Sequence, residues 1–230
     1  MNELFRNSAT MGVVLSFLAY EVGILIKNKM KKAVFNPLLI SIVIVIAVLL
    51  IFNVDYDSYN QSAKYISYLL TPATVSLAIS LYRQLDLLKQ NLMAIIIGIL
   101  SGVLTSLVSI LGMSMAFGLT HEEYVTLLPK SITTAIGMGV SEELGGYVTI
   151  TVVVIIITGI LGNMIGSFAC KLFRIQNPIS KGLALGTSSH VIGTTKAMEM
   201  GEIEGAMSSL SIVVAGLMTV VLASIFAMIY

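Results

Sequence analysis

The chain has 230 residues, of which 57% are hydrophobic and only 11% are charged, and its net charge is +1. Because a soluble domain carries about 25% charged residues, this composition excludes an ordinary soluble protein and predicts a polytopic integral membrane protein. The nearly neutral charge excludes a basic surface for nucleic acid. The single cysteine, Cys170, excludes a disulfide framework.

Seven apolar segments are predicted as membrane-spanning helices, each of which needs about 20 residues. In chain order they are residues 8–26, 37–52, 61–84, 91–117, 146–173, 178–200 and 206–230. Residues 126–146 are too polar for a helix that faces lipid. The sequence therefore predicts an all-α membrane protein with about seven transmembrane helices and one domain over residues 1–230.

The basic residues predict how the chain is threaded through the membrane. Loops with excess lysine and arginine lie in the cytoplasm, which places the lysines of residues 27–32 there. The basic residues of 83–89 and 171–181 fall on the same side only if residues 126–146 form a re-entrant hairpin. This topology puts the N-terminus outside and the C-terminus in the cytoplasm. Eight full crossings, with one basic loop on the wrong side, are the alternative.

An internal repeat is predicted from the order of the elements. Residues 36–117 and 146–230 each contain a plain span, a broken element and a span with glycines. One constant shift superimposes Leu92 on Leu210 and Gly98 on Gly216. Inverted repeats with broken helices at matching positions are typical of secondary transporters.

Three polar interruptions, at residues 71–74, 131–134 and 186–196, are the candidate binding regions. A helix that is interrupted at membrane depth exposes N–H groups and the positive end of its dipole, which together bind anions. Few aromatic residues accompany these stretches, which favours a small carboxylate. The candidate substrate-binding residues are Thr71, Pro72, Thr74, Ser131, Thr133, Thr134, Gly186, Thr187, Ser188, Ser189, His190, Gly193, Thr194 and Lys196.

Several of these residues have alternative interpretations. His190 could bind substrate, carry a coupled proton or be a structural histidine, and Glu142 is the other candidate for proton coupling. Lys130 and Lys196 could balance a carboxylate, although Lys196 could equally end a helix at the membrane surface. Glycines in the apolar spans are interpreted as helix-packing positions. These are Gly98, Gly102, Gly159, Gly162, Gly166 and Gly216.

Metal and enzyme functions are not predicted. No cysteine, aspartate or second histidine lies at metal-ligand spacing from His190. The chain also lacks the common motifs of hydrolases, zinc proteases and phosphate loops. We therefore expect no metal, no cofactor and no catalysis.

Longer motifs resemble the LrgB/CidB family over nearly the whole chain. They are PATV at 72–75 with LYR at 81–83, LPKSITT at 128–134 with SEELGG at 141–146, and KGLALGTSSH at 181–190 continuing to Ser209. As a departure from the family pattern, Ser80, Ala135 and Val191 stand where relatives carry proline, proline and a small residue.

The resemblance implies two functions. One is transport of small monocarboxylates, such as pyruvate, glycolate, glycerate or lactate, as in the related plastidial glycolate/glycerate translocator. The other is an antiholin-like role with small LrgA/CidA partners in murein hydrolase control and cell lysis. We predict a transporter in a bacterial plasma membrane, acting with an LrgA/CidA-type partner, and keep the antiholin-like regulator as the alternative. Homo-oligomers are open in both cases.

Overall fold

The computed structural model describes residue 8, residues 10–30 and residues 35–230, and all secondary structure in this part of the chain is helical. The side chains of Leu70, Thr71, Thr74, Leu77, Ser80 and Leu81 lie outside the description. The chain divides into two units, Met1–Ser76 and Leu77–Tyr230. Within the described residues, four helices are long and apolar enough to cross a membrane, so the predicted count of seven is not confirmed.

The N-terminal unit contains two helices that pack together, α2 (Met11–Met30) and α3 (Pro37–Ile51). Asn36 caps α3, because its side chain accepts hydrogen bonds from the first backbone N–H groups of the helix. The short helix α4 (Tyr56–Ala63) follows and returns to the start of α2. There the Gly12 N–H donates to Ser62 Oγ at 2.7 Å.

The third predicted span is interrupted, but not where the sequence predicts. A 3₁₀ helix, η1 (Lys64–Leu69), changes to the α-helix α5 (Leu70–Arg83). Pro72 therefore lies in the first turn of α5, where a backbone N–H has no partner within the helix in any case. Ser76 Oγ donates to the Pro72 carbonyl at 2.9 Å inside the helix. The prediction of a break at 71–74 is wrong, because this proline starts a helix rather than interrupting one.

Three long helices form the frame of the C-terminal unit: α7 (Leu92–Phe117), α10 (Val148–Leu172) and α12 (Glu202–Ala227). A short helix, α6 (Leu85–Gln90), precedes α7. On α10 the large apolar side chains of Ile157, Leu161 and Ile165 are exposed, whereas Gly159 and Gly166 are buried. Apolar side chains on the outside and small residues inside are expected of helices that pack together in lipid.

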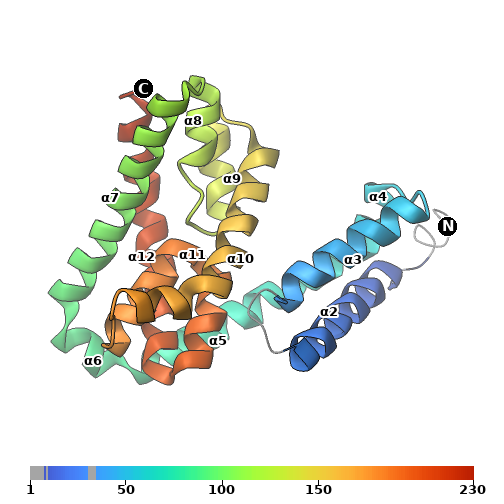
Figure 1. Ribbon diagram of the computed structural model, residues 1–230, viewed down its shortest axis with the longest axis horizontal. Helices are drawn as coiled ribbons and strands as arrows, with labels where there is room; N and C mark the ends of the chain where they lie inside the picture. The colour runs from blue at the N-terminus through green and yellow to red at the C-terminus, as the bar shows by residue number, and fades with distance from the viewer. Residues whose placement is uncertain (1–7, 9, 31–34) are drawn as a thin grey trace. The chain divides into compact units, whose positions relative to one another are not determined.

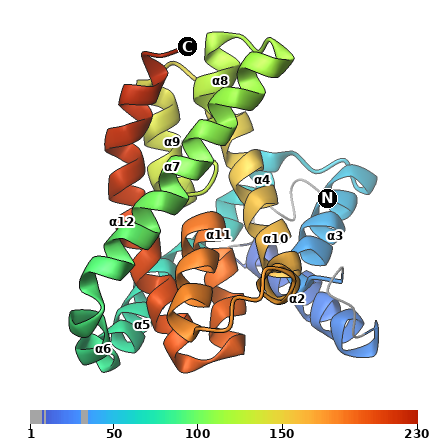
Figure 2. The ribbon, with the colours of Figure 1, turned by 60° about the vertical axis from the view of Figure 1, so that its left-hand side comes forward.

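The first polar stretch of this unit folds as a helical hairpin. It consists of α8 (His121–Leu127) and α9 (Thr134–Glu143), joined by a loop. At about 10 Å and about 15 Å, these helices are too short to cross a bilayer core of about 30 Å. The start of α10 holds both arms, because Thr151 Oγ1 lies 2.9 Å from the Thr126 carbonyl and 2.7 Å from Ser141 Oγ. The two arms are therefore joined at the start of α10, which is at the upper end of the unit in Figures 1 and 2.

The helix α11 (Pro178–Met200) is also a hairpin, because its backbone leaves the helical conformation at Ser189 and His190. Its first half runs parallel to α12, because its contacts follow the order of residues in α12. Gly182 packs against the Glu204 carbonyl and Gly186 packs against the Ser208 carbonyl, each too closely to leave room for a Cβ. The second half runs back: Thr194 bonds to Ser208, and Met198 lies against Gly205, nearer the start of α12.

The interruption predicted within 186–196 is therefore present, but residues 178–200 reverse direction instead of continuing as one straight helix. The second hairpin occupies the lower half of the unit and the first occupies the upper half (Figures 1 and 2).

The position of the C-terminus follows from this reversal. Tyr230 donates from its hydroxyl to the Leu119 carbonyl at 2.7 Å, and its own carbonyl lies 3.2 Å from His121 Nδ1. The sequence predicts the loop at His121 outside and the C-terminus in the cytoplasm. The structure contradicts this opposition, because α11 reverses its direction and α12 ends beside the start of α8.

Candidate functional site

The tips of the two hairpins both lie against one face of α7. Ser131, in the loop between α8 and α9, has its Oγ 3.4 Å from Ser106 Oγ. One turn earlier on α7, a Cβ on Gly102 would lie only 2.7 Å from Thr187 Cγ2, at the end of the first half of α11. Residues four apart lie on the same helix face. Ser131 and Thr187, which are far apart in the sequence, therefore lie one turn apart along α7.

The helix α10 forms the opposite wall of this region. His190 Nε2 lies 3.0 Å from the Ile155 carbonyl, and a Cβ on Gly137 of α9 would collide with the Ile155 side chain. Ile155 is thus in contact with both hairpins. Gly162 lies directly under Ser189, where any side chain on α10 would displace the tip.

His190 shapes the second tip. The residue is buried, and its φ of 42° is in a region that non-glycine residues rarely adopt. Nε2 donates to the Ile155 carbonyl, so a neutral ring leaves Nδ1 as an acceptor. The backbone carbonyl of His190 accepts from Thr194 Oγ1 at 2.9 Å. His190 therefore joins the second tip to α10 through its ring and holds the following turn through its carbonyl.

Most hydroxyls of the second hairpin bond within the protein. Thr194 Oγ1 lies 2.8 Å from Ser208 Oγ, and Ser188 Oγ lies 3.0 Å from Ser189 Oγ. Thr187 differs, because its Oγ1 is buried without a hydrogen-bond partner in the described part of the chain. Native proteins rarely bury a hydroxyl unpaired, so Thr187 is the hydroxyl that is free for a ligand.

One formal charge lies at the tips. Lys130 is partly buried, and its Nζ donates to Ser131 Oγ at 2.9 Å. None of the ion pairs among the described residues involves Lys130. Lys196 instead pairs with Glu199 at 2.7 Å, near the outer end of α11. The counter-charge predicted for a carboxylate therefore fits Lys130 and not Lys196.

The remaining candidates lie in several places. Thr133 and Thr134 begin α9, so the positive end of this helix dipole is at the first tip. Gly186 and Gly193 allow the close approach of α12 and of the first half of α11, respectively. Glu142 is exposed at the outer end of α9. Thr71, Pro72 and Thr74 belong to the N-terminal unit, and the side chains of both threonines lie outside the described residues.

Sequence reasoning missed two polar residues in apolar spans. Ser106 contacts the first tip. Asn163, on α10, donates from Nδ2 to the Ile192 carbonyl and to Thr195 Oγ1, both at 2.9 Å. An asparagine inside an apolar span is a signal that could have found the second contact, because polar residues in membrane helices usually face the protein interior. No group of three or more metal-ligating side chains occurs in residues 10–30 and 35–230.

Comparison with known proteins shows the family of this chain. The model of the LrgB-like family matches residues 16–229. Proteins named "Antiholin-like protein LrgB" from Bacillus mycoides (strain KBAB4), Bacillus cereus (strain B4264) and Bacillus anthracis (strain CDC 684 / NRRL 3495) are each 38% identical over 216 residues, which is 94% of this chain and of theirs. No solved structure matches. The chain belongs to the LrgB-like family.

Proposed function

We propose that this member of the LrgB-like family is a secondary transporter of small monocarboxylates, of the pyruvate, glycolate, glycerate and lactate class, across the bacterial plasma membrane. The observation that carries the proposal is that two hairpin tips, which enter from opposite ends of the unit, lie one turn apart along α7. They carry Lys130 and the hydroxyl of Thr187, which is buried without a partner among the described residues. Irregular backbone at membrane depth is tolerated only where it is buried in protein or lines a cavity.

The proposed membrane arrangement follows from the charges at the two ends. Lys89, Lys171, Arg174 and Lys181 lie at the lower end of the C-terminal unit, on α6 and around the α10–α11 turn (Figures 1 and 2). The positive-inside rule makes this end cytoplasmic. Three helices then cross, α7, α10 and α12, and the hairpins enter from opposite faces.

The N-terminal region is consistent with this arrangement. With the N-terminus outside, three crossings by residues 8–26, 37–52 and 61–84 bring the chain to the cytoplasmic start of α7. The whole protein then has six crossings and two hairpins, every basic loop lies inside, and Tyr230 is outside.

A carboxylate fits the chemistry of the tips. Lys130 supplies one positive charge, and Ser131 and Thr187 supply hydroxyl donors. The helix α9 and the second half of α11 both begin at the tips, so two positive dipole ends add to the attraction for an anion. Secondary transporters bind anionic groups in this way at interrupted helices. Because a single lysine is available, we propose one carboxylate per substrate.

The order of elements also supports an inverted repeat, although with different blocks from 36–117 and 146–230. The helix α7 is followed by a hairpin that enters at the end where α7 finishes, and α10 is followed by a hairpin that enters at the opposite end. We propose that residues 92–143 and 148–200 are the related halves. A site between such halves can be exposed alternately to either side.

The experiment is uptake of labelled carboxylates into liposomes that contain the purified protein, with and without an LrgA/CidA-type partner. Saturable uptake is expected for the wild type and for Lys89→Gln, whose lysine lies on α6 away from the tips. Lys130→Gln and Thr187→Val are expected to reduce uptake at least ten-fold. Normal uptake by both tip variants would contradict the site, and absence of uptake under all conditions would contradict the function.

A second function, an antiholin-like regulator of a holin-type pore, is favoured by the name of the Bacillus relatives. A regulator acts by helix contacts with its LrgA-like partner and needs no ligand. It therefore predicts no thermal stabilisation by carboxylates, whereas a transporter is stabilised by any substrate that it binds when folded. The tip variants separate the two functions, because a regulator keeps its cellular phenotype in Thr187→Val.

A further inference from the structure

A polar cavity lies at the lower end of the C-terminal unit, away from the hairpin tips. It has a volume of about 530 Å³ and lies between the end of α10 and both outer ends of the α11 hairpin. Its polar lining comes from Ser167, Lys171, Arg174, Gln176 and Lys181. We call it the basic pocket, because its three charged side chains are all cationic.

The positive charge of the basic pocket is only partly balanced. Lys181 lies 3.9 Å from Glu204, at the start of α12. Lys171 and Arg174 take part in none of the ion pairs found within the described ranges. Two like charges thus lie near each other at the end of one helix, an arrangement that an anion would stabilise.

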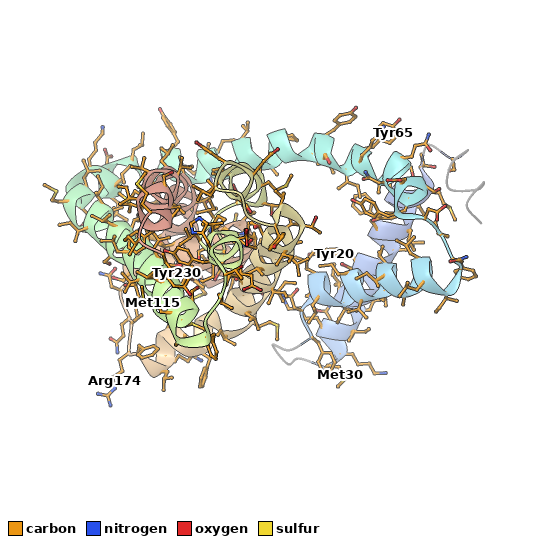
Figure 3. The ribbon with its side chains drawn as sticks, turned by 90° about the horizontal axis from the view of Figure 1, so that it is seen from above. Tyr20, Met30, Tyr65, Met115, Arg174 and Tyr230 are labelled. Atoms are coloured by element: carbon orange, nitrogen blue, oxygen red, sulfur yellow. The ribbon has the colours of Figure 1, made fainter. Side chains whose placement is uncertain are left out.

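The backbone at Arg174 is unusual for an arginine. Arg174 has φ 54° directly after α10, and Ile175 N–H closes the helix end by donating to the Cys170 carbonyl at 2.8 Å. Glycine or asparagine normally occupies such a left-handed position. Here the position carries an exposed guanidinium, whose side chain extends away from the helices in Figure 3.

The apolar side chains beside the basic pocket indicate that the anion belongs to a lipid. Phe168, Leu172 and Phe173 are exposed next to the basic residues, at the end of a helix that is long enough to cross a membrane. Acyl chains can cover this apolar surface while the headgroup reaches Lys171 and Arg174. Basic pockets between membrane helices on the cytoplasmic side bind anionic headgroups in this manner.

The basic pocket is closed off from the hairpin tips. Between them, Leu185 packs against Gly166 and Ser189 packs against Gly162, and neither glycine leaves room for a Cβ. We propose that the basic pocket binds the phosphate headgroup of an anionic phospholipid. This inference does not depend on the proposed transport function.

The test measures lipid binding and thermal unfolding of the purified full chain in detergent, with phosphatidylglycerol, phosphatidylcholine or inorganic phosphate. Native mass spectrometry counts bound lipid, and circular dichroism follows unfolding. We expect phosphatidylglycerol to bind and to raise the melting temperature, and the other two to have little effect. Because a basic residue near an anionic surface contributes about 1 kcal/mol, removing one should weaken binding about five-fold.

Two variants and a matched control make the test specific. Arg174→Gly removes the charge but suits the left-handed backbone, so it should fold at least as well as the wild type and still bind phosphatidylglycerol about five-fold more weakly. Lys171→Gln should weaken binding to a similar degree, whereas Lys89→Gln, outside the pocket, should bind normally. Equal binding by all three variants would overturn the site. Stabilisation by inorganic phosphate without lipid binding would overturn the lipid assignment.

Discussion

Replacing Thr187 by valine should make the protein more stable and a poorer binder of its substrate. Thr187 is only 7% exposed, and its Oγ1 has no partner in the part of the chain that the structure describes. A buried hydroxyl without a hydrogen bond costs about 1–3 kcal/mol. Valine keeps the methyl group that packs against Gly102 and removes this cost. A gain of about 1 kcal/mol raises the melting temperature of a chain of this length by about 2–4 °C.

The matched control is Thr194→Val, on the same hairpin. Thr194 Oγ1 lies 2.9 Å from the His190 carbonyl and 2.8 Å from Ser208 Oγ. Removing it breaks two buried hydrogen bonds, so this variant should lose about 2 kcal/mol. The same change from threonine to valine is therefore expected to raise the stability of the protein at one position and to lower it at another, seven residues further along the chain.

The assay is thermal unfolding of both variants, followed by circular dichroism, without substrate and with a saturating monocarboxylate. Without substrate, Thr187→Val should melt above the wild type and Thr194→Val below it. With substrate, the wild type should gain stability and Thr187→Val should gain less, because the hydroxyl that binds the anion is absent. If Thr187→Val melts below the wild type, the hydroxyl has a structural partner and the reasoning is refuted.

Two further predictions concern packing and topology. Gly162→Ala should destabilise the protein by about 1–3 kcal/mol, because its Cβ would collide with Ser189. Gly112→Ala, where nothing lies within 4 Å, should instead stabilise α7 by up to about 1 kcal/mol in the same unfolding assay. In a Cys170→Ala background, cysteines placed at Glu122 and at Met228 should both react with a membrane-impermeant maleimide on intact cells. Reaction at only one of them would contradict the arrangement of α11 and α12.

Sequence alone was sufficient for the class of fold and for the location of the second tip. A run of glycines and hydroxyls between apolar segments indicates an interrupted helix, and the interruption lies at Ser189 and His190. What the run does not determine is the direction in which the chain continues. Reversal depends on contacts with other helices, such as Gly182 and Gly186 against α12 and Gly162 against Ser189. Such contacts are not visible in a local pattern.

Other differences have similarly local causes. Proline favours the first turn of a helix as well as a break, so Pro72 alone could not distinguish the two. Lysine near the end of a polar run could face a ligand or a carboxylate one turn away, and Lys196 pairs with Glu199. Conversely, Ser106 was overlooked because a single serine in an apolar span carries no periodic signal. Its importance comes from Ser131, which is brought to it by the fold.

The amide of Asn163 affects how often the second half of α11 leaves its packed position on α10. Two hydrogen bonds from this amide end on the same half-helix, at Ile192 and Thr195, so any sliding of that half-helix along α10 breaks both together. At about 1 kcal/mol for each bond, the contact favours the packed position by about 2 kcal/mol, a factor of about 30 in population. This contact alone therefore lowers the population of a displaced state about thirty-fold. A ligand that binds the displaced state more tightly than the packed state opposes this bias.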